Sequence, residues 1–301
     1  MNTLATAVDR PSNTTPNQAA LNMTEVEILS KAKQYMGGVA WPTIITTLLA
    51  VTTYLAVLAG VILDYLPGIP SFLVLSYLVY VVYTPLHEAV HNNITGRNLK
   101  LRWLNNVIGY IVASILGVSF TMHRSAHMTH HRETNVEGKD PDLAYKNSSL
   151  YSLTVGGVLT LLQEYQDYFG RVFPKASLTE KITVIVELFV FVGWRVAVAM
   201  AGYPVEVLVY TLASNIVGVT LLGLIFAWIV HQPYGETARY KNTNTILLPK
   251  WVHRPATTLW LWQNYHSIHH LFPKVPFYQY EKLFNEIEPG MVERGAPIIR
   301  V

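Results

Sequence analysis

The sequence predicts an all-α integral membrane protein, with four transmembrane helices in two hairpins, interfacial or re-entrant helices beside them, and a histidine-rich cap on the cytoplasmic side. Three observations predict it. Hydrophobic residues make up 51% of the 301 positions and charged residues only 14%, against roughly 25% charged residues in soluble domains. Four apolar runs are long enough to cross a bilayer. All eleven histidines lie between positions 87 and 270, around the ends of these runs.

The two ends of the chain differ from its centre. Residues 1–22 are polar and rich in Thr, Asn and Pro, which predicts a disordered tail. The sequence TEVEILSKAKQYM follows and predicts a short amphipathic helix, with Thr24 as its N-cap and Glu27 as the partner in a capping box. We expect one membrane domain over residues 23–290 and a C-terminal tail over 291–301.

Four apolar runs form the predicted hairpins. Each is close to or above the roughly 20 residues that a helix needs to cross the hydrocarbon core. Short turns that contain Pro and Gly join the first run to the second and the third run to the fourth. The predicted spans are residues 41–63, 69–86, 182–201 and 207–230.

Lysine and arginine set the predicted orientation. Neither tight turn, 64–68 or 202–206, contains one, whereas every other connecting segment does. Because positive residues stay on the cytoplasmic side, both hairpin tips face away from the cytoplasm and both chain ends lie inside. No targeting peptide is evident at the N-terminus, so we expect a bacterial inner membrane.

Two shorter apolar segments, 104–120 and 150–162, carry positive charges at both ends. We predict interfacial or re-entrant helices there. If 104–120 crossed the membrane instead, the histidines on its two flanks would lie on opposite faces.

One predicted span contains two charged residues, Glu187 and Arg195. Charges inside a span usually face the protein interior. The two positions are eight apart, about two helical turns, so the side chains share a face. We expect them to pair through a neighbour and to have no catalytic role.

The histidines fall into three clusters. Residues at i, i+3 and i+4 of a helix share one face, and each cluster has such spacing. Eight imidazoles exceed the four ligands of one zinc ion and suit two metal ions. Imidazole binds Zn, Cu, Fe or Ni, so the ligand type alone does not name the metal. The clustered residues are His87, His91, His127, His130, His131, His266, His269 and His270.

Three histidines lie outside this spacing pattern. His231 ends an apolar span, where an unpaired imidazole is costly, so we expect it to be a ligand. His123 lies one turn before His127, and three roles stay open for it: ligand, donor behind the ligands, or exposed residue. We expect His253, in a basic loop, to be an ordinary surface or hydrogen-bonded residue.

Two rival functions follow from single features. HEAVH at 87–91 matches the zinc peptidase signature, with Glu88 as base, but a peptidase would leave six clustered histidines unexplained. A metal transporter would place its site near the bilayer midplane, whereas these clusters lie at the ends of spans.

The net charge of +3 is small and scattered, which gives no reason to expect nucleic acid as a partner. The absence of cysteine excludes thiolate ligands.

The boxes HEAVH, HMTHH and HSIHH resemble the three histidine boxes of the membrane fatty acid desaturase and hydroxylase superfamily, over about residues 87–280. HHRETN followed by KDPD is similar to its second box, and NYHSIHHLFPKVPFYQY to its third. The resemblance implies a non-haem di-iron centre, O2 as oxidant and a lipophilic substrate. It implies as metal ligands His87, His91, His127, His130, His131, His231, His266, His269 and His270.

Within the superfamily, PKVPFYQY after the third box and QNY before it are most similar to carotenoid ring hydroxylases. The resemblance therefore implies hydroxylation of a β-carotene ring at carbon 3. A fatty-acyl or sphingolipid desaturase or hydroxylase is the first alternative, and a carotenoid ketolase is the next. The sequence shows no flavin, nicotinamide or haem-binding motif, so we expect a ferredoxin or cytochrome b5-like protein to supply electrons.

Two further sets of residues complete the expected site. Side chains that orient the imidazoles by accepting their free N–H groups are typical of metal sites. The candidates for this role are Glu88, Asp140, Asp142 and Glu164. Asn135 and Asn264 are expected either to help them or to cap helices. Aromatic residues expected either to line the substrate's path or to pack against lipid and protein are Tyr83, Phe189, Phe191, Trp194, Phe226 and Trp228.

Overall fold

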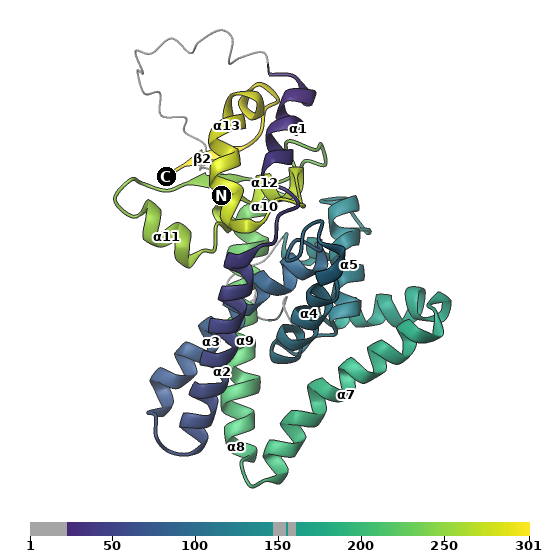
Figure 1. Cartoon of the computed structure of the whole chain (residues 1–301), viewed down its shortest axis with the longest axis vertical. Helices are drawn as coiled ribbons and strands as arrows, with labels where there is room; N and C mark the ends of the chain where they lie inside the picture. Colours follow the sequence, from purple (N-terminus) through teal and green to yellow (C-terminus); the bar gives the residue numbers. More distant parts are fainter. Residues whose placement is uncertain (1–22, 147–154, 156–160) are drawn as a thin grey trace.

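The computed structural model of the protein describes residues 23–146, 155 and 161–301. Among these residues, four helices are long and apolar enough to cross a membrane, or five if one bent pair of helices is a single span. Figure 1 shows α2, α3 and α9 side by side, with α7 slanting away from them. The integral membrane fold is thus confirmed, with candidate spans α2 (Trp41–Ile62), α3 (Gly68–Val90), α7 (Leu178–Met200) and Pro204–His231.

Helix α3 is the central element of the membrane region. It packs against α2, α4 (Trp103–Leu116) and α9 (Ser214–Leu222). The sequence predicted its end at residue 86, where polar residues begin, but the helix continues to Val90. Thr84, His87 and Glu88 are buried within the protein, so the helix extends without exposing these groups to lipid.

The last span is a continuous helix built from shorter pieces. It begins with α8 (Pro204–Glu206), passes through α9, and ends with α10 (Ile229–His231). The segments Val207–Ala213 and Gly223–Trp228 have π-helical hydrogen bonding, which is frequent at functional sites. The span ends on a buried histidine, His231.

The helix predicted at 104–120 is present but ends early, at a sharp corner. Helix α4 ends at Leu116, and α5 (Phe120–Glu133) begins after a break, at an angle of 97° to the preceding helix. Gly117 adopts a φ of +80° and closes α4 in the left-handed conformation that glycine favours. The corner lets the chain turn toward the site instead of continuing along α4.

The two charges in α7 hold this corner and do not pair with each other. Arg195 donates to the carbonyl oxygens of Ser114 (3.0 Å) and Ile115 (2.9 Å) at the end of α4. Glu187 accepts hydrogen bonds from the side chains of Ser119 and Thr121 at the start of α5. The expected pairing through a neighbour is therefore wrong, because each charge finds unsatisfied backbone or hydroxyl groups at a helix end.

Arg195→Met is expected to lower the free energy of unfolding by about 3 kcal/mol, because it leaves buried carbonyl groups of the corner without their charged donor. Thermal unfolding of the purified protein in detergent measures this loss. Arg171→Met is the control, because the Arg171 side chain is exposed and pairs only with an exposed Asp167, an interaction worth at most about 1 kcal/mol. Equal effects of the two substitutions would contradict the role given to Arg195.

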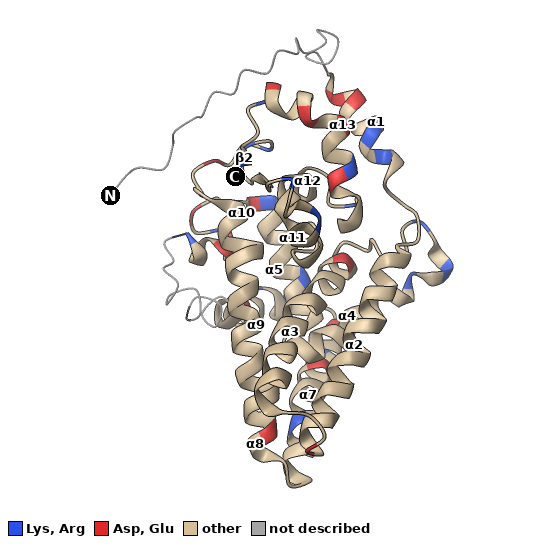
Figure 2. Ribbon diagram, turned by 90° about the vertical axis from the view of Figure 1, so that its left-hand side faces the viewer, with Lys and Arg blue, Asp and Glu red and all other residues tan. Residues whose placement is uncertain are grey.

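A small cap covers the end of the bundle at which α3 finishes. It contains α1 (Glu25–Gln34), α11 (His253–Leu259), α12 (His266–Leu271), α13 (Tyr280–Glu293) and two strands. Figure 2 shows many of the charged residues in this region and few along the helices below it. The predicted capping box of Thr24 and Glu27 at the start of α1 is present.

The C-terminal residues belong to the fold. The sequence predicted a tail over 291–301, but α13 runs to Glu293 and β2 (Ile298–Arg300) pairs in parallel with β1 (Thr245–Leu247). Ile298 packs against the hydrophobic core, and β1 offers backbone groups that a second strand can pair with. The tail predicted at 1–22 and most of the helix predicted at 150–162 lie outside the described residues.

Candidate metal centre

Four segments far apart in the sequence bring their histidines together. His87 lies in α3 and His91 caps its end. The second cluster lies on α5, and the third lies on α12. His231 ends α10. The sequence placed these residues on shared helix faces, and the structure turns the faces toward one another.

The first histidine group comprises His87, His91, His127, His131 and His269. One ring nitrogen from each lies within 4.8 Å of those of the other four. Within the group, Nε2 of His127 lies 2.9 Å from Nε2 of His91 and 3.0 Å from Nε2 of His131. Nε2 of His131 lies 2.7 Å from Nε2 of His269.

The second histidine group comprises His130, His231 and His270, whose ring nitrogens also lie within 4.8 Å of one another. His266 adjoins it, since its Nε2 is 3.1 Å from Nε2 of His270. The two groups are adjacent, because the rings of His131 and His270 stack with centroids 4.5 Å apart. Eight of the nine histidines that the resemblance implied as ligands thus form two neighbouring groups, and the ninth, His266, adjoins the second.

The Nδ1 atoms of several rings face away from the groups and have polar partners. His130 Nδ1 donates to Asp140 at 2.7 Å, and His269 Nδ1 lies 3.1 Å from the hydroxyl of Tyr280. A partner on Nδ1 fixes the ring and leaves Nε2 for a metal ion. The role expected for Asp140 agrees with this geometry.

Two weaker contacts follow the same pattern. Nδ1 of His266 lies 3.3 Å from the side-chain oxygen of Gln263, and Nδ1 of His270 lies 3.4 Å from the hydroxyl of Thr134. Carboxylates and asparagines were the expected partners, and Gln263, Thr134 and Tyr280 were not expected from the sequence. Gln263 had a usable signal, since it lies three residues before His266, but Tyr280 reaches His269 only through tertiary packing.

The arrangement fits bound metal ions. An ion about 2 Å from each nitrogen would hold its ligand nitrogens within roughly 4 Å of one another, close to the spacing of the two groups. Both ring nitrogens of His87 and Nδ1 of His231 are buried and have no hydrogen-bond partner among the described residues. Buried imidazoles facing one another without donors are what a cation would stabilise.

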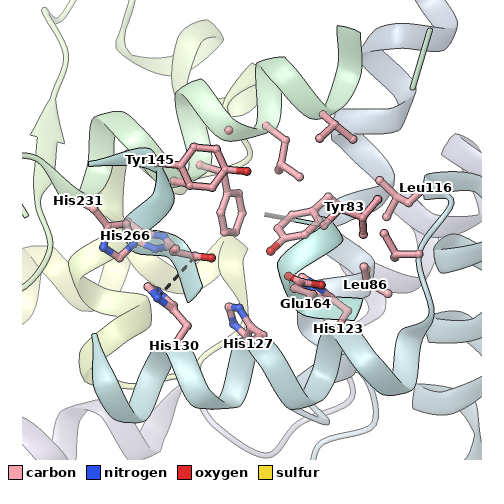
Figure 3. Close-up of a pocket in the computed structure, with 18 residues that line it drawn as sticks. Tyr83, Leu86, Leu116, His123, His127, His130, Tyr145, Glu164, His231 and His266 are labelled. Carbon is pink, nitrogen blue, oxygen red and sulfur yellow. Dashed lines mark hydrogen bonds and ion pairs between the residues drawn. The ribbon is translucent and has the colours of Figure 1, made fainter. Parts of the chain in front are cut away.

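A cavity adjoins the histidines (Figure 3). His127, His130, His231 and His266 line one side, and Leu86 and Leu116 line another. Tyr83 and Phe226, two of the aromatic residues expected along the substrate's path, also line it. An apolar molecule in this cavity would touch the imidazoles at one end and aliphatic side chains at the other.

The remaining expected aromatic residues do not line this cavity. Phe189 is exposed on the outside of α7. Phe191 and Trp194 pack against the guanidinium of Arg195, and Trp228 packs against Tyr145 and Tyr234. The sequence analysis could not separate these positions, because lipid-facing and cavity-facing aromatic residues have the same local pattern.

The other polar residues expected to orient imidazoles differ in outcome. Asp142 lies 3.5 Å from Nδ1 of His130, and burial raises the pKa of its carboxyl to about 6, although nearby His130 favours the charged form. Glu164 lies 3.5 Å from Nδ1 of His123. Both carboxylates therefore contact a histidine.

The hydrogen bonds that the structure shows for the side chains of Glu88, Asn135 and Asn264 go to groups other than imidazoles. Glu88 accepts from Asn93, Asn135 donates to the carbonyl oxygens of 236 and 242, and Asn264 donates to that of 246. Asn135 and Asn264 therefore connect separate segments of the backbone.

His123 and His253 lie outside both groups. His123 lines the cavity, its Nε2 is buried without a partner among the described residues, and its ring lies 5.5 Å from that of Tyr83. His253 Nε2 lies 2.7 Å from Glu281, which agrees with the expected hydrogen-bonded residue.

Comparison with known proteins decides the family. Residues 63–301 match the family described as fatty acid desaturase. The chain belongs to the fatty acid desaturase family. This confirms the resemblance seen in the three histidine boxes and, with it, the prediction of an oxidoreductase.

Two proteins of Haematococcus lacustris are similar to this chain. One, named Beta-carotene 4-ketolase 3, is 26% identical over 164 residues, and the other, named Beta-carotene ketolase, is 25% identical over 164 residues. Each match covers 54% of the chain and 44% of the relative. The chain thus spans less than half the length of these relatives.

Proposed function

We propose that this desaturase-family protein oxidises an unactivated C–H bond on the ring of a carotenoid, using O2 and two iron ions held by the two histidine groups. The observation that supports it best is the pair of adjacent, buried imidazole groups facing an apolar cavity. An acid or base side chain alone cannot remove hydrogen from such a bond. The chemistry that the irons supply when bound is the activation of O2 with electrons from a donor outside the chain.

The chain's own residues bind, orient and exclude water. The Nε2 atoms of the groups would hold the ions, while Asp140 and Tyr280 keep the rings of His130 and His269 in place. Leu86, Leu116 and Phe226 form cavity walls that favour a hydrocarbon ring over water. The substrate's position in this cavity selects the carbon that reacts.

The motif after the third box favours hydroxylation at ring carbon 3, whereas the names of the two relatives favour a keto group, which one of the names places at carbon 4. Both reactions begin with removal of hydrogen from neighbouring ring carbons. We therefore propose the carotenoid ring as substrate and treat the two positions as the outcomes to be distinguished.

Expression in a host that accumulates β-carotene is expected to produce oxygenated carotenoid, because the host supplies both the substrate and a reducing partner. Chromatography and mass spectrometry of the extracted pigments measure the product: a hydroxyl group adds one oxygen, and a keto group adds one oxygen and removes two hydrogens. The His131→Ala variant is the control. Unchanged pigments with active protein would contradict a carotenoid substrate.

A fatty-acyl or sphingolipid substrate is the second candidate, favoured by the description of the family that the chain matches. In the same cells, new double bonds or hydroxyl groups in acyl chains, with carotenoids unchanged, would support it. An external ferredoxin or cytochrome b5-like donor, a cytoplasmic position of the histidines and a bacterial inner membrane remain part of the proposal.

Purified protein is expected to contain about two iron ions per chain, because eight imidazoles form two groups, with His266 beside the second, and one ion cannot use them all. Elemental analysis measures the metal content after purification from iron-supplied cells. One zinc ion per chain and no iron would contradict the di-iron proposal and favour a zinc site at the first histidine group.

A further inference from the structure

A polar pocket lies outside the histidine site, where the connection before α2 meets the connection after α3. Its charged residues are Arg97, Arg102 and Lys274. Asn92, Asn93 and Asn98 supply side-chain amides to the same pocket. No acidic side chain lines it among the described residues, so its walls offer chiefly positive charge and hydrogen-bond donors.

These three cations have no acidic partner. In the part of the chain that the structure describes, none of them forms an ion pair with Asp or Glu. By contrast, Arg294 and Arg300 in the cap each pair with a glutamate. Like charges gathered without counterions repel one another, and a bound anion would relieve this repulsion.

The pocket is held in shape by close backbone contacts. Arg97 donates its N–H to the carbonyl of Gly37 at 3.0 Å, and a Cβ on Gly37 would lie 2.7 Å from Nε of Arg97. A Cβ on Gly96 would lie 2.4 Å from the carbonyl oxygen of Gly37. Both glycines have positive φ. These contacts fix the Arg97 side chain over the loop before α2.

The pocket lies at the end of two membrane spans. Trp41 opens α2 and Trp103 opens α4, and they are 61% and 59% exposed. Tryptophan is enriched at the boundary between hydrocarbon and headgroups. Leu99, which lines the pocket, is 78% exposed. Cations beside exposed apolar groups at the boundary between hydrocarbon and headgroups would bind a molecule with a negatively charged head and a hydrocarbon tail.

We propose that this pocket binds the phosphate headgroup of an anionic phospholipid. Arg97, Arg102 and Lys274 would bind the phosphate oxygens through charged hydrogen bonds, and the exposed faces of Leu99 and Trp103 would contact the acyl chains. Free phosphate has the same head chemistry but would gain nothing from these apolar residues. The pocket also adjoins the first histidine group, because Lys274 donates to the carbonyl of His91.

The test compares thermal unfolding of the whole purified protein with increasing phosphatidylglycerol or phosphatidylcholine of equal chain length, in one detergent. A ligand that binds the folded state raises the unfolding temperature. Phosphatidylglycerol is expected to raise it above the value in phosphatidylcholine, and native mass spectrometry is expected to show one retained phosphatidylglycerol per chain.

The pocket variant is Arg97→Gln, Arg102→Gln and Lys274→Gln together. Its half-saturating phosphatidylglycerol concentration is expected to rise roughly a hundredfold, since each cation near a lipid surface contributes about a tenfold or smaller factor. The control variant is Lys250→Gln, Arg254→Gln and Lys282→Gln, which removes the same charge from exposed positions and is expected to bind as the wild type does. If the triple pocket variant does not fold, Arg102→Gln against Arg254→Gln gives the same comparison.

Four results would overturn the proposal. The first is an equal unfolding temperature in phosphatidylglycerol and in phosphatidylcholine. The second is an equal loss of phosphatidylglycerol affinity in the pocket variant and the control variant. The third is an increase in unfolding temperature with inorganic phosphate that equals the increase with phosphatidylglycerol at the same concentration. The fourth is a pocket variant that binds phosphatidylglycerol normally but accepts electrons more slowly from an acidic donor protein, which would make the pocket a protein-docking surface.

Discussion

His131→Ala is expected to abolish turnover and to remove bound iron. The Nε2 of His131 lies between those of His127 and His269, at 3.0 Å and 2.7 Å, and its ring stacks on that of His270 in the second histidine group. The substitution removes a nitrogen from the first group and opens the boundary between the two. The loss of activity should exceed the 10–100-fold that typically follows loss of a partner behind a ligand.

Product formation in the β-carotene host and iron content of the purified protein measure this effect together. His253→Ala is the matched control, because His253 is a partly buried histidine that bonds Glu281 and belongs to neither group. We expect that variant to retain iron and activity. Substantial activity in His131→Ala, at normal expression, would show that the first histidine group is not the metal site.

Asp140→Asn is expected to weaken iron binding and activity by about 10–100-fold. The carboxylate of Asp140 accepts from Nδ1 of His130 at 2.7 Å and from the backbone N–H groups of Asn135 and Asp142 at 2.7 and 2.9 Å. An amide keeps the shape, but it loses the negative charge and replaces one acceptor with a donor. His130 would then lose the partner that directs its Nε2 toward the second group.

Iron titration of the apoprotein measures the affinity, and circular dichroism checks that the helices remain. Asp167→Asn is the control, because Asp167 is exposed and pairs with exposed Arg171, and no imidazole contact of Asp167 is found among the described residues. An unchanged iron affinity in Asp140→Asn would mean that His130 needs no carboxylate to hold its orientation.

Much of the membrane fold could be predicted from the sequence, because the signals are local. An uncharged run of about 20 residues must be a helix when it crosses lipid, since its backbone groups have no other partners there. The predicted and observed spans accordingly overlap along nearly their whole length. One exception is the end of α3, which continues past residue 86 because protein covers its last turn. Hydropathy along the sequence does not show this cover.

The corner between α4 and α5 could not be predicted in the same way. Its apolar segment reads as one helix, and the residues that hold the corner, Glu187 and Arg195, lie about 70 to 80 positions further along the chain. The sequence showed that these two charges share a face of one helix. Only the structure showed that this face meets two helix ends, where carbonyl and hydroxyl groups need partners.

The same distinction between local signals and tertiary contacts applies to the histidines. The sequence by itself determined which imidazoles share a helix face, because the i, i+3 and i+4 spacing acts within one helix. The tertiary structure decided which faces meet, which histidines form each group, and that Tyr280 and Gln263 lie behind His269 and His266. The physical reason is distance along the chain: contacts between α3, α5, α10 and α12 depend on how the whole bundle packs, and no local pattern encodes that packing.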